Sequence, residues 1–250
     1  MSERAPVRPL DVRRAFRDIW RLYRDHWRLL TFLAVVVLVP QSLLDAAFGD
    51  IRIERVHSLA DVAKLLSIPL ALVINLGGEA FYSGIVAAVT LHWRAGIARP
   101  HVGEVAARIP YLTLIAIDLI VALGTAVGLL FLVVPGFAFA TYTFISPALV
   151  EVRGLGLRAA LREGYELVRG NFRRVLVIGV TVYVVTEAAS ELVALPFEGF
   201  KLEAAGHLLG EAVLQPFQGA AAVIVALALL EIHGREPVSV GTEPSAAGAA

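Results

Sequence analysis

Five acidic residues lie within long apolar segments of the chain: Glu79, Asp118, Glu187, Glu191 and Glu211. Acids inside a membrane are costly and often functional. No Lys or Arg lies inside the same apolar segments to pair with them. Each acid therefore has to be protonated, face water, bind a cation or bond to a polar neighbour. We take the five acids as candidates for a proton or cation site.

The spacing of these residues groups them into pairs. Glu187 and Glu191 are four residues apart and share one helix face, as do His207 and Glu211. A short connection would let the two pairs face each other, where they could hold a divalent cation or relay protons. Such spacing is common, so a structural or interfacial role is the competing interpretation. The metal stays unspecified. Glu79 and Asp118 could share a proton if their helices touch.

Enzyme signatures are absent from the sequence. There is no Gly-rich phosphate loop, no His-Glu-x-x-His and no Gly-x-Ser-x-Gly. The chain has no cysteine, which excludes disulfides and thiolate-metal sites. The six histidines are scattered. We therefore predict no catalytic site and no cofactor.

Two stretches 145 positions apart are near copies of each other. The identical pairs are Ala15/Ala160, Arg17/Arg162, Leu22/Leu167, Arg24/Arg169 and Arg28/Arg173. Acidic and aromatic character is kept at Asp18/Glu163, Trp20/Tyr165 and Trp27/Phe172. Each stretch precedes an apolar run, so we predict a weak internal repeat whose copies are parallel in the membrane. Gly78-Glu79-Ala80 and Gly210-Glu211-Ala212 are a weaker second trace.

Each copy is predicted to be an amphipathic basic helix lying in the membrane interface. Apolar residues recur at helical spacing, as Phe16, Trp20, Tyr23 and Trp27, and then as Leu161, Tyr165, Val168 and Phe172. Such a helix places its apolar side in the acyl boundary and its Arg residues near lipid phosphates. The candidate phosphate contacts are Arg17, Arg24, Arg28, Arg162, Arg169 and Arg173. A purely structural anchor is the competing interpretation.

The composition predicts an all-α, polytopic integral membrane protein with one domain over 1–240. The chain is 58% hydrophobic and 18% charged, against about 45–50% and about 25% in soluble domains. Apolar runs of this length span a bilayer. The six predicted spans are about 29–48, 66–92, 110–134, 137–152, 174–196 and 207–232. The fourth is short and either tilted or re-entrant, and we expect a retained first span and a disordered tail over 241–250.

Charge asymmetry predicts the orientation. Of the 22 Lys and Arg residues, all but Arg52, Arg55, Lys64 and Lys201 lie in segments 1–28, 93–109, 151–174 and the C-terminal tail. Basic residues favour the cytoplasmic side. We therefore expect six crossings with both termini in the cytoplasm of a bacterial inner membrane.

Two further motifs concern the central apolar run. Pro135-Gly136 is expected to break it into two spans. Gly124 and Gly128 form a G-x-x-x-G, which permits close helix approach. We favour packing within the bundle over dimerisation for this motif.

The region 144–172 carries a family resemblance. It contains Pro147-Ala148-Leu149-Val150-Glu151, then Ala159-Ala160-Leu161-Arg162 and Gly164-Tyr165 before Phe172. This pattern resembles the membrane domain attached to some bacterial glycerophosphodiester phosphodiesterases and related stand-alone six-span proteins. Gly164-Tyr165 departs from the usual Ser-Trp pair. The resemblance implies a polytopic helical domain without the separate soluble catalytic barrel.

The sequence thus predicts a non-enzymatic accessory, scaffold or lipid-interacting protein. Its expected partners are the bilayer, anionic phospholipid and another membrane protein, and nucleic acid is not expected because the Arg residues abut the membrane. The rival prediction is a small transporter or permease-like protein that uses the intramembrane acids.

Overall fold

A computed structural model describes residues 9–48, 59–97, 100–131, 133–197 and 203–237. Within the helices it describes the side chains of all residues except 42–48, 59–75, 131, 197, 203–205 and 207. The helices are α1 Val12–Phe48, α2 Leu59–Ala95, α3 Val102–Arg108, α4 Tyr111–Phe131, α5 Val133–Thr143, α6 Ser146–Arg153, α7 Leu157–Arg169, α8 Phe172–Ala194, the 3-10 turn η1 Leu195–Phe197 and α9 Glu203–Ile232. The described residues contain no strand, which confirms the all-α class. The predicted tail 241–250 lies outside them.

Four segments are long and apolar enough to cross a membrane: Tyr111–Leu130, Val133–Arg153, Phe172–Ala194 and Leu208–Ile232. They match the last four predicted spans, so the chain is a multi-pass membrane protein by length and composition. The first two predicted spans, 29–48 and 66–92, lie in α1 and α2 but include residues whose side chains are not described. Six crossings therefore remain a prediction.

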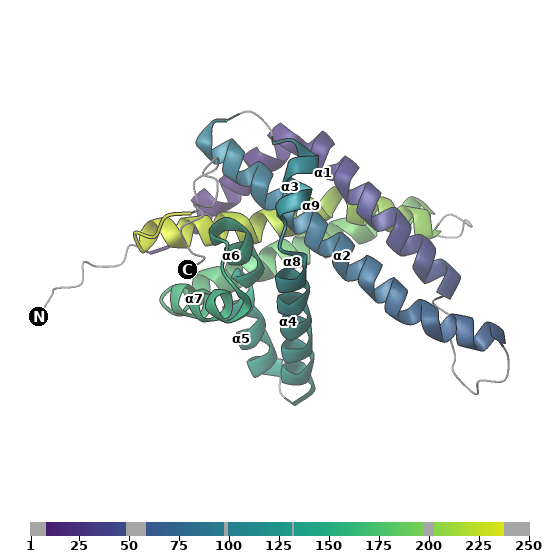
Figure 1. The fold of residues 1–250 in the computed structure, drawn as a ribbon. Coiled ribbons are helices and arrows are strands. Elements are labelled where there is room, and N and C mark those ends of the chain that lie inside the picture. Colours follow the sequence, from purple (N-terminus) through teal and green to yellow (C-terminus); the bar gives the residue numbers. More distant parts are fainter. Residues whose placement is uncertain (1–8, 49–58, 98–99, 132, 198–202, 238–250) are drawn as a thin grey trace, which may run out of the picture.

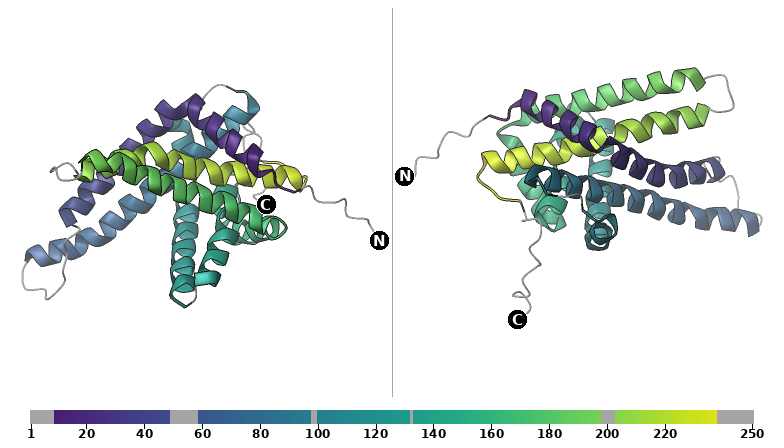
Figure 2. Two further views of the ribbon diagram at one scale, coloured as in Figure 1. Left: turned by 180° about the vertical axis from the view of Figure 1, so that it is seen from behind. Right: turned by 90° about the horizontal axis from the view of Figure 1, so that it is seen from above.

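Helix α9 is the centre of the bundle. It packs against α8, α1, α2 and α6, and Figures 1 and 2 show α8 and part of α1 running beside it. Its contact faces carry small residues, which let neighbouring helices approach closely. Ala220, Ala221 and Ala226 are fully buried there beside Ile224 and Leu229.

Helices α4 and α5 form a hairpin that projects away from the bundle (Figure 1). Leu112, Leu130 and Val134 are 85%, 81% and 78% exposed, so the hairpin offers apolar side chains to its surroundings on several sides. A Cβ on Gly124 would lie 2.3 Å from the Phe139 ring, and one on Gly128 would lie 2.7 Å from the Gly136 Cα. The G-x-x-x-G therefore closes this hairpin, which confirms the prediction of internal packing.

Two helix breaks differ from the prediction. The first comes before Val133, and Pro135 lies in the first turn of α5, where a missing N–H costs little. The second comes at Phe144 and Ile145, inside the predicted span 137–152, because Pro147 begins a new helix. The predicted fourth span is therefore two helices, α5 and α6.

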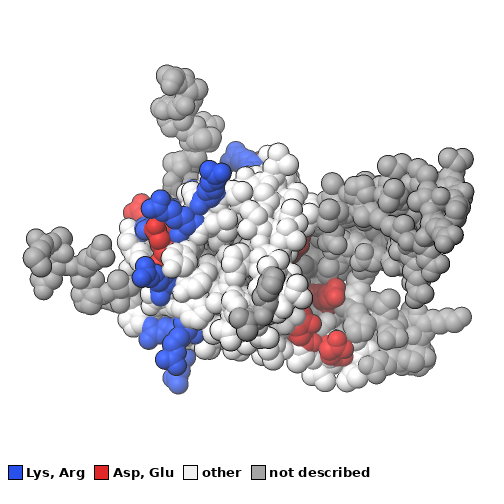
Figure 3. Space-filling model, turned by 90° about the horizontal axis from the view of Figure 1, so that it is seen from below, with Lys and Arg blue, Asp and Glu red and all other residues white. Residues whose placement is uncertain are grey.

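The Arg-rich segments meet at one end of the bundle. The Leu10 N–H donates to the Asn171 side chain (2.9 Å), and the Trp93 indole N–H donates to Asp25 (3.2 Å). Seen from below, Lys and Arg gather at one end of the visible face, and a wide uncharged zone separates them from acidic residues nearer the other end (Figure 3). This arrangement fits segments 1–28, 93–109 and 151–174 lying on one side of the membrane.

Candidate functional site

The two near copies bury equivalent positions. Ala15 and Ala160 are 3% and 0% exposed, and Leu22 and Leu167 are both fully buried. Between them, Ile19 corresponds to Gly164, which is also buried. The matching positions face the bundle because they recur at the helical period. The repeat seen in the sequence therefore has the same inward face in both copies.

Phe16, Trp20, Tyr23 and Trp27 lie along one face of the continuous helix α1, as their spacing predicts. Trp20 and Trp27 are 56% and 47% exposed, whereas the Tyr23 ring stacks on Phe217 of α9 at 4.1 Å. The inward face is taken by Ala15, Ile19 and Leu22 instead, so the tryptophans lie at its edge. In the second copy, Tyr165 at 46% exposure takes the place of Trp20. The exposed tryptophans are compatible with the helix in the membrane interface that the sequence analysis predicted, and the interfacial position stays a prediction.

All six candidate phosphate contacts are exposed: Arg17, Arg24, Arg28, Arg162, Arg169 and Arg173. The Arg28 guanidinium lies 5.6 Å from the centre of the Trp27 ring, within cation–π range. Arg24 is 3.6 Å from Asp25, and the Arg162 Nε donates to Glu166 at 3.1 Å. Within the part of the chain that the structure describes, Arg17, Arg169 and Arg173 form no ion pair. Their charges are open to an external anion.

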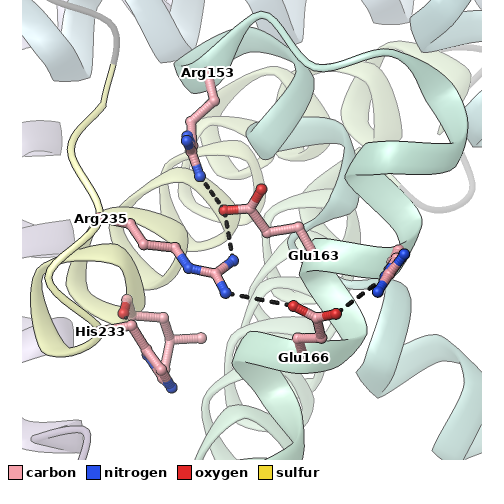
Figure 4. Close-up of polar contacts among 7 residues, drawn as sticks. Arg153, Glu163, Glu166, His233 and Arg235 are labelled. Atoms are coloured by element: carbon pink, nitrogen blue, oxygen red, sulfur yellow. Dashed lines mark hydrogen bonds and ion pairs between the residues drawn. The ribbon is translucent and has the colours of Figure 1, made fainter.

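An ion-pair network ties α7 to the ends of α6 and α9 (Figure 4). Arg153 donates to Glu163, whose carboxylate also lies 3.0 Å from Arg235. Arg235 in turn donates to Glu166 at 3.3 Å. Glu163 is only 13% exposed in its side chain, so this pair is better shielded than the others. No local pattern predicted this network, because its partners come from three separate segments.

Helix ends place the two arginines of the network. Gly154 (φ +63°) ends α6 and Gly234 (φ +64°) follows α9, and this left-handed conformation is one that glycine adopts without strain. The Arg235 N–H then donates to the Leu230 carbonyl at 2.9 Å, which turns the chain back toward α7. Hydrogen bonds from Arg162 and then Arg235 lower the pKa of Glu166 below its ordinary value. The segment that follows α9 is therefore held to α7 by the bond between Arg235 and the Glu166 carboxylate.

The structure brings Asp118 and Glu79 close enough for their charges to interact, as the sequence analysis had considered. Asp118 also interacts electrostatically with Glu151 of α6. The Ser83 hydroxyl of α2 donates to the Glu151 carboxylate at 2.5 Å. Three carboxyl groups from α2, α4 and α6 are thus gathered with one hydroxyl. Among the described residues, no Lys or Arg pairs with any of them.

Glu187 and Glu211 line one cavity of about 170 Å³ between α1, α8 and α9. Thr186, Ser190 and Gln218 line it too, and the Gln218 amide donates to the Thr186 hydroxyl at 2.8 Å. Glu191 is exposed and does not line this cavity. The His207 side chain lies outside the described part, so its predicted place beside Glu211 is untested. No group of three or more His, Asp or Glu in the described residues is placed to hold a metal ion.

Glu151 and Ser83 are the polar residues that the sequence analysis missed. Glu151 follows the Pro147-Ala148-Leu149-Val150 motif, so it was taken for the end of a span. The sequence did contain a signal for Glu151, because an acid that directly follows an apolar run could have been added to the candidate acids. The contact with Ser83, 68 positions away, is tertiary and leaves no local pattern.

Comparison of the chain with protein-family models, with curated proteins and with solved structures finds no match. The resemblance to the phosphodiesterase-associated membrane domain stays a prediction that rests on the motifs of region 144–172. What the fold and its sites establish is a helical, multi-pass membrane protein with a basic end and carboxyl groups gathered among its apolar helices.

Proposed function

We propose that this protein is a non-enzymatic, multi-pass protein of a bacterial inner membrane that binds anionic phospholipid through its two basic helices. One observation carries the proposal. The two copies bury equivalent positions and leave equivalent arginines exposed, next to an exposed aromatic residue, at one end of the bundle. Aromatic rings and arginines that are exposed at the same depth are typical of the lipid headgroup region of a membrane.

The bundle's charge pattern supports the orientation of this proposal. Leu10 and Arg235 bond to residues of the Arg-rich end, Asn171 and Glu166, and basic segments are retained on the cytoplasmic side. A cytoplasmic leaflet rich in anionic lipid would then face Arg17, Arg28 and Arg173. The basic helices hold the protein in register with the membrane surface, which suits an accessory or scaffold for another membrane protein.

Thermal unfolding of the protein in lipid nanodiscs tests the proposal. Phosphatidylglycerol is expected to raise the midpoint over phosphatidylcholine, because a ligand of the folded state stabilises it by mass action. The double variant Arg17→Gln, Arg173→Gln should lose most of that rise. Its charge-matched control is Arg108→Gln, Arg158→Gln, which removes two exposed arginines outside the candidate set. Equal losses in both would sink the proposal, since they would mean an unspecific charge effect.

A second candidate function is favoured by the three carboxyl groups of α2, α4 and α6. Carboxyl groups that interact inside a membrane protein without a cationic partner are suited to carrying protons. The protein would then act as a small proton-coupled transporter. Proton flux in proteoliposomes should fall in Glu79→Gln, Asp118→Asn and Glu151→Gln. Absence of flux in the unaltered protein, under a pH gradient of either direction, would reject this function.

A further inference from the structure

A polar cavity lies where the last turns of α8 face the early turns of α9, away from the Arg-rich start of α8. The two helices run side by side (Figure 2). Gly210 lets them approach closely, because a Cβ there would lie 2.6 Å from the Ser190 Oγ and 2.9 Å from the Ser190 carbonyl oxygen. The cavity beside this contact has a volume of about 170 Å³. A single water needs about 10–15 Å³ of such space, so the cavity has room for a small organic group.

Ser190 brings an unpaired hydroxyl to the cavity. The residue lines the cavity and is only 8% exposed, and its Oγ forms no hydrogen bond with any residue that the structure describes. The Oγ faces α9 at Gly210, the position before Glu211. It is not one of the polar atoms that are sealed from solvent without a partner, so its free surface opens to the cavity. A buried polar group of this kind is stabilised when a partner reaches it.

The neighbouring polar side chains use their donors within the protein. The Thr186 hydroxyl donates to the Val182 carbonyl at 2.8 Å and accepts the Gln218 Nε2–H at 2.8 Å. The Gln218 amide is thereby oriented through its nitrogen, and its carbonyl oxygen has no partner in the described part of the chain. The lining therefore offers acceptors to a ligand.

Two carboxylates give the cavity a negative charge. Glu187 lies in the apolar segment Phe172–Ala194 and Glu211 in Leu208–Ile232. Neither forms an ion pair with a Lys, Arg or His of the described ranges. Acids within a span are costly when no cation accompanies them, and an ionised carboxylate only accepts hydrogen bonds. The cavity thus selects a ligand that is positively charged and donates hydrogen bonds.

The lining favours an ammonium group over a metal ion. No group of three or more His, Asp or Glu among the described residues is placed to hold a metal ion. Leu38 and Leu214 add apolar wall, which suits carbon atoms attached to the nitrogen of the ligand. A primary ammonium group carries three N–H donors, as many as the two carboxylates and the Ser190 hydroxyl can accept.

We propose that this cavity binds a primary ammonium group, whose N–H donors are accepted by Glu187, Glu211 and Ser190. The group belongs to a soluble amine or to the ethanolamine headgroup of a phospholipid, since both carry the same –NH₃⁺. The proposal does not rest on lipid binding by the two basic helices, because no arginine lines the cavity.

The test uses the full chain in phosphatidylcholine nanodiscs and measures the unfolding midpoint against ethylammonium chloride. Tetramethylammonium chloride at the same ionic strength supplies the charge without an N–H donor, and magnesium chloride supplies a metal ion. A further arm replaces part of the lipid with phosphatidylethanolamine and omits the soluble cations.

Three variants change the lining, and a fourth is the matched control. Glu187→Gln and Glu211→Gln each remove one carboxylate, and Ser190→Ala removes the hydroxyl. Glu191→Gln makes the same charge change on an exposed residue of α8 outside the lining. Glu187 and Glu211 are exposed as well, so their variants serve if Ser190→Ala fails to fold.

We expect ethylammonium or phosphatidylethanolamine to raise the midpoint, because a ligand of the folded state stabilises it. Glu187→Gln and Glu211→Gln should each weaken the apparent affinity at least about tenfold, and Ser190→Ala about twofold to tenfold. Glu191→Gln should respond like the unaltered protein. A response to ethylammonium assigns a soluble amine, and a response to phosphatidylethanolamine alone assigns the headgroup.

Four results overturn the inference: no response to ethylammonium or phosphatidylethanolamine, an equal response to tetramethylammonium, a response to magnesium alone, or cavity variants that respond like Glu191→Gln. The variant Arg17→Gln, Arg173→Gln should keep the amine response whether or not it loses the response to phosphatidylglycerol. Failure of the cavity is therefore separable from failure of the proposed function.

Discussion

Residues 15–28 and 160–173 are near copies, yet they end in different ways. The first continues without interruption through α1, whereas the second stops at Arg169 and restarts as α8 at Phe172. Asp25 and His26 of the first copy correspond to Gly170 and Asn171 of the second. Gly170 and Asn171, two residues that favour turns, thus lie where the second copy is interrupted and the first is continuous.

The copies also differ in their partners. Asp18 lies 3.9 Å from Arg14 on the same helix, whereas Glu163 is held by Arg153 and Arg235 from other segments. Arg21 of the first copy corresponds to Glu166 of the second, so only the second has a carboxylate at this position. The two near copies therefore share their buried positions but differ in the partners of their polar side chains.

The largest expected effect concerns the buried position that the two copies share. Ile19→Ala should destabilise the protein by about 2–5 kcal/mol, because it leaves a cavity at a site that is 2% exposed. Gly164→Val should cost about 1–3 kcal/mol, because overpacking is also unfavourable, and here a Cβ would lie 2.6 Å from the Ser146 hydroxyl. Denaturant unfolding measures both. A Gly164→Val variant as stable as the unaltered protein would contradict the tight packing of α7.

The next effect separates the two acids at equivalent positions. Glu163→Gln should cost about 1–3 kcal/mol, because it leaves two partly shielded arginines without their carboxylate. Asp18→Asn should change stability by less than about 0.5 kcal/mol, because its partner Arg14 is 62% exposed, lies 3.9 Å away and belongs to the same helix. The same unfolding assay compares them. Similar costs at the two positions would show that the network adds nothing.

Acid should weaken the second copy through Glu166. The pKa of Glu166 is lowered by its hydrogen bonds with Arg162 and then Arg235, so its contribution is fully present above the ordinary Glu pKa of about 4.3. That contribution is lost as the pH falls through the lower pKa of the folded state. The unaltered protein should therefore lose more stability than Glu166→Gln when unfolding midpoints at pH 6 and pH 3 are compared. Parallel losses in the two proteins would refute this role of Glu166.

The smallest expected effect is a difference in lipid stabilisation between variants of Arg17 and Arg162, which occupy equivalent positions in the two copies. Arg17 forms no ion pair among the described residues, whereas Arg162 is bonded to Glu166. Arg17→Gln should therefore lower the stabilisation by phosphatidylglycerol more than Arg162→Gln does, with little change in phosphatidylcholine. Nanodisc midpoints again provide the measurement, and the reverse order would mean that Arg162 leaves Glu166 to reach the lipid.

The sequence predicted most of the helices because long apolar runs carry their own signal. The near copies marked equivalent positions but not their burial, since Leu22 and Leu167 turn inward whereas the identical arginines are exposed. The hydropathy pattern did not reveal the helix break at Phe144 and Ile145, because the apolar run continues through these residues. The sequence analysis considered a Glu79–Asp118 pair, but the interaction of Asp118 with Glu151 depends on contacts among α2, α4 and α6 that no local pattern encodes.

The central place of α9 has a consequence for biosynthesis. This helix follows all the other described helices in the chain, so it is the last of them to leave the ribosome. Until then the inner faces of α1, α2 and α8 lack the partner against which they pack. A ribosome that stalls before Glu203 would leave an incomplete bundle with those faces open in the membrane, a natural substrate for membrane chaperones and quality-control proteases.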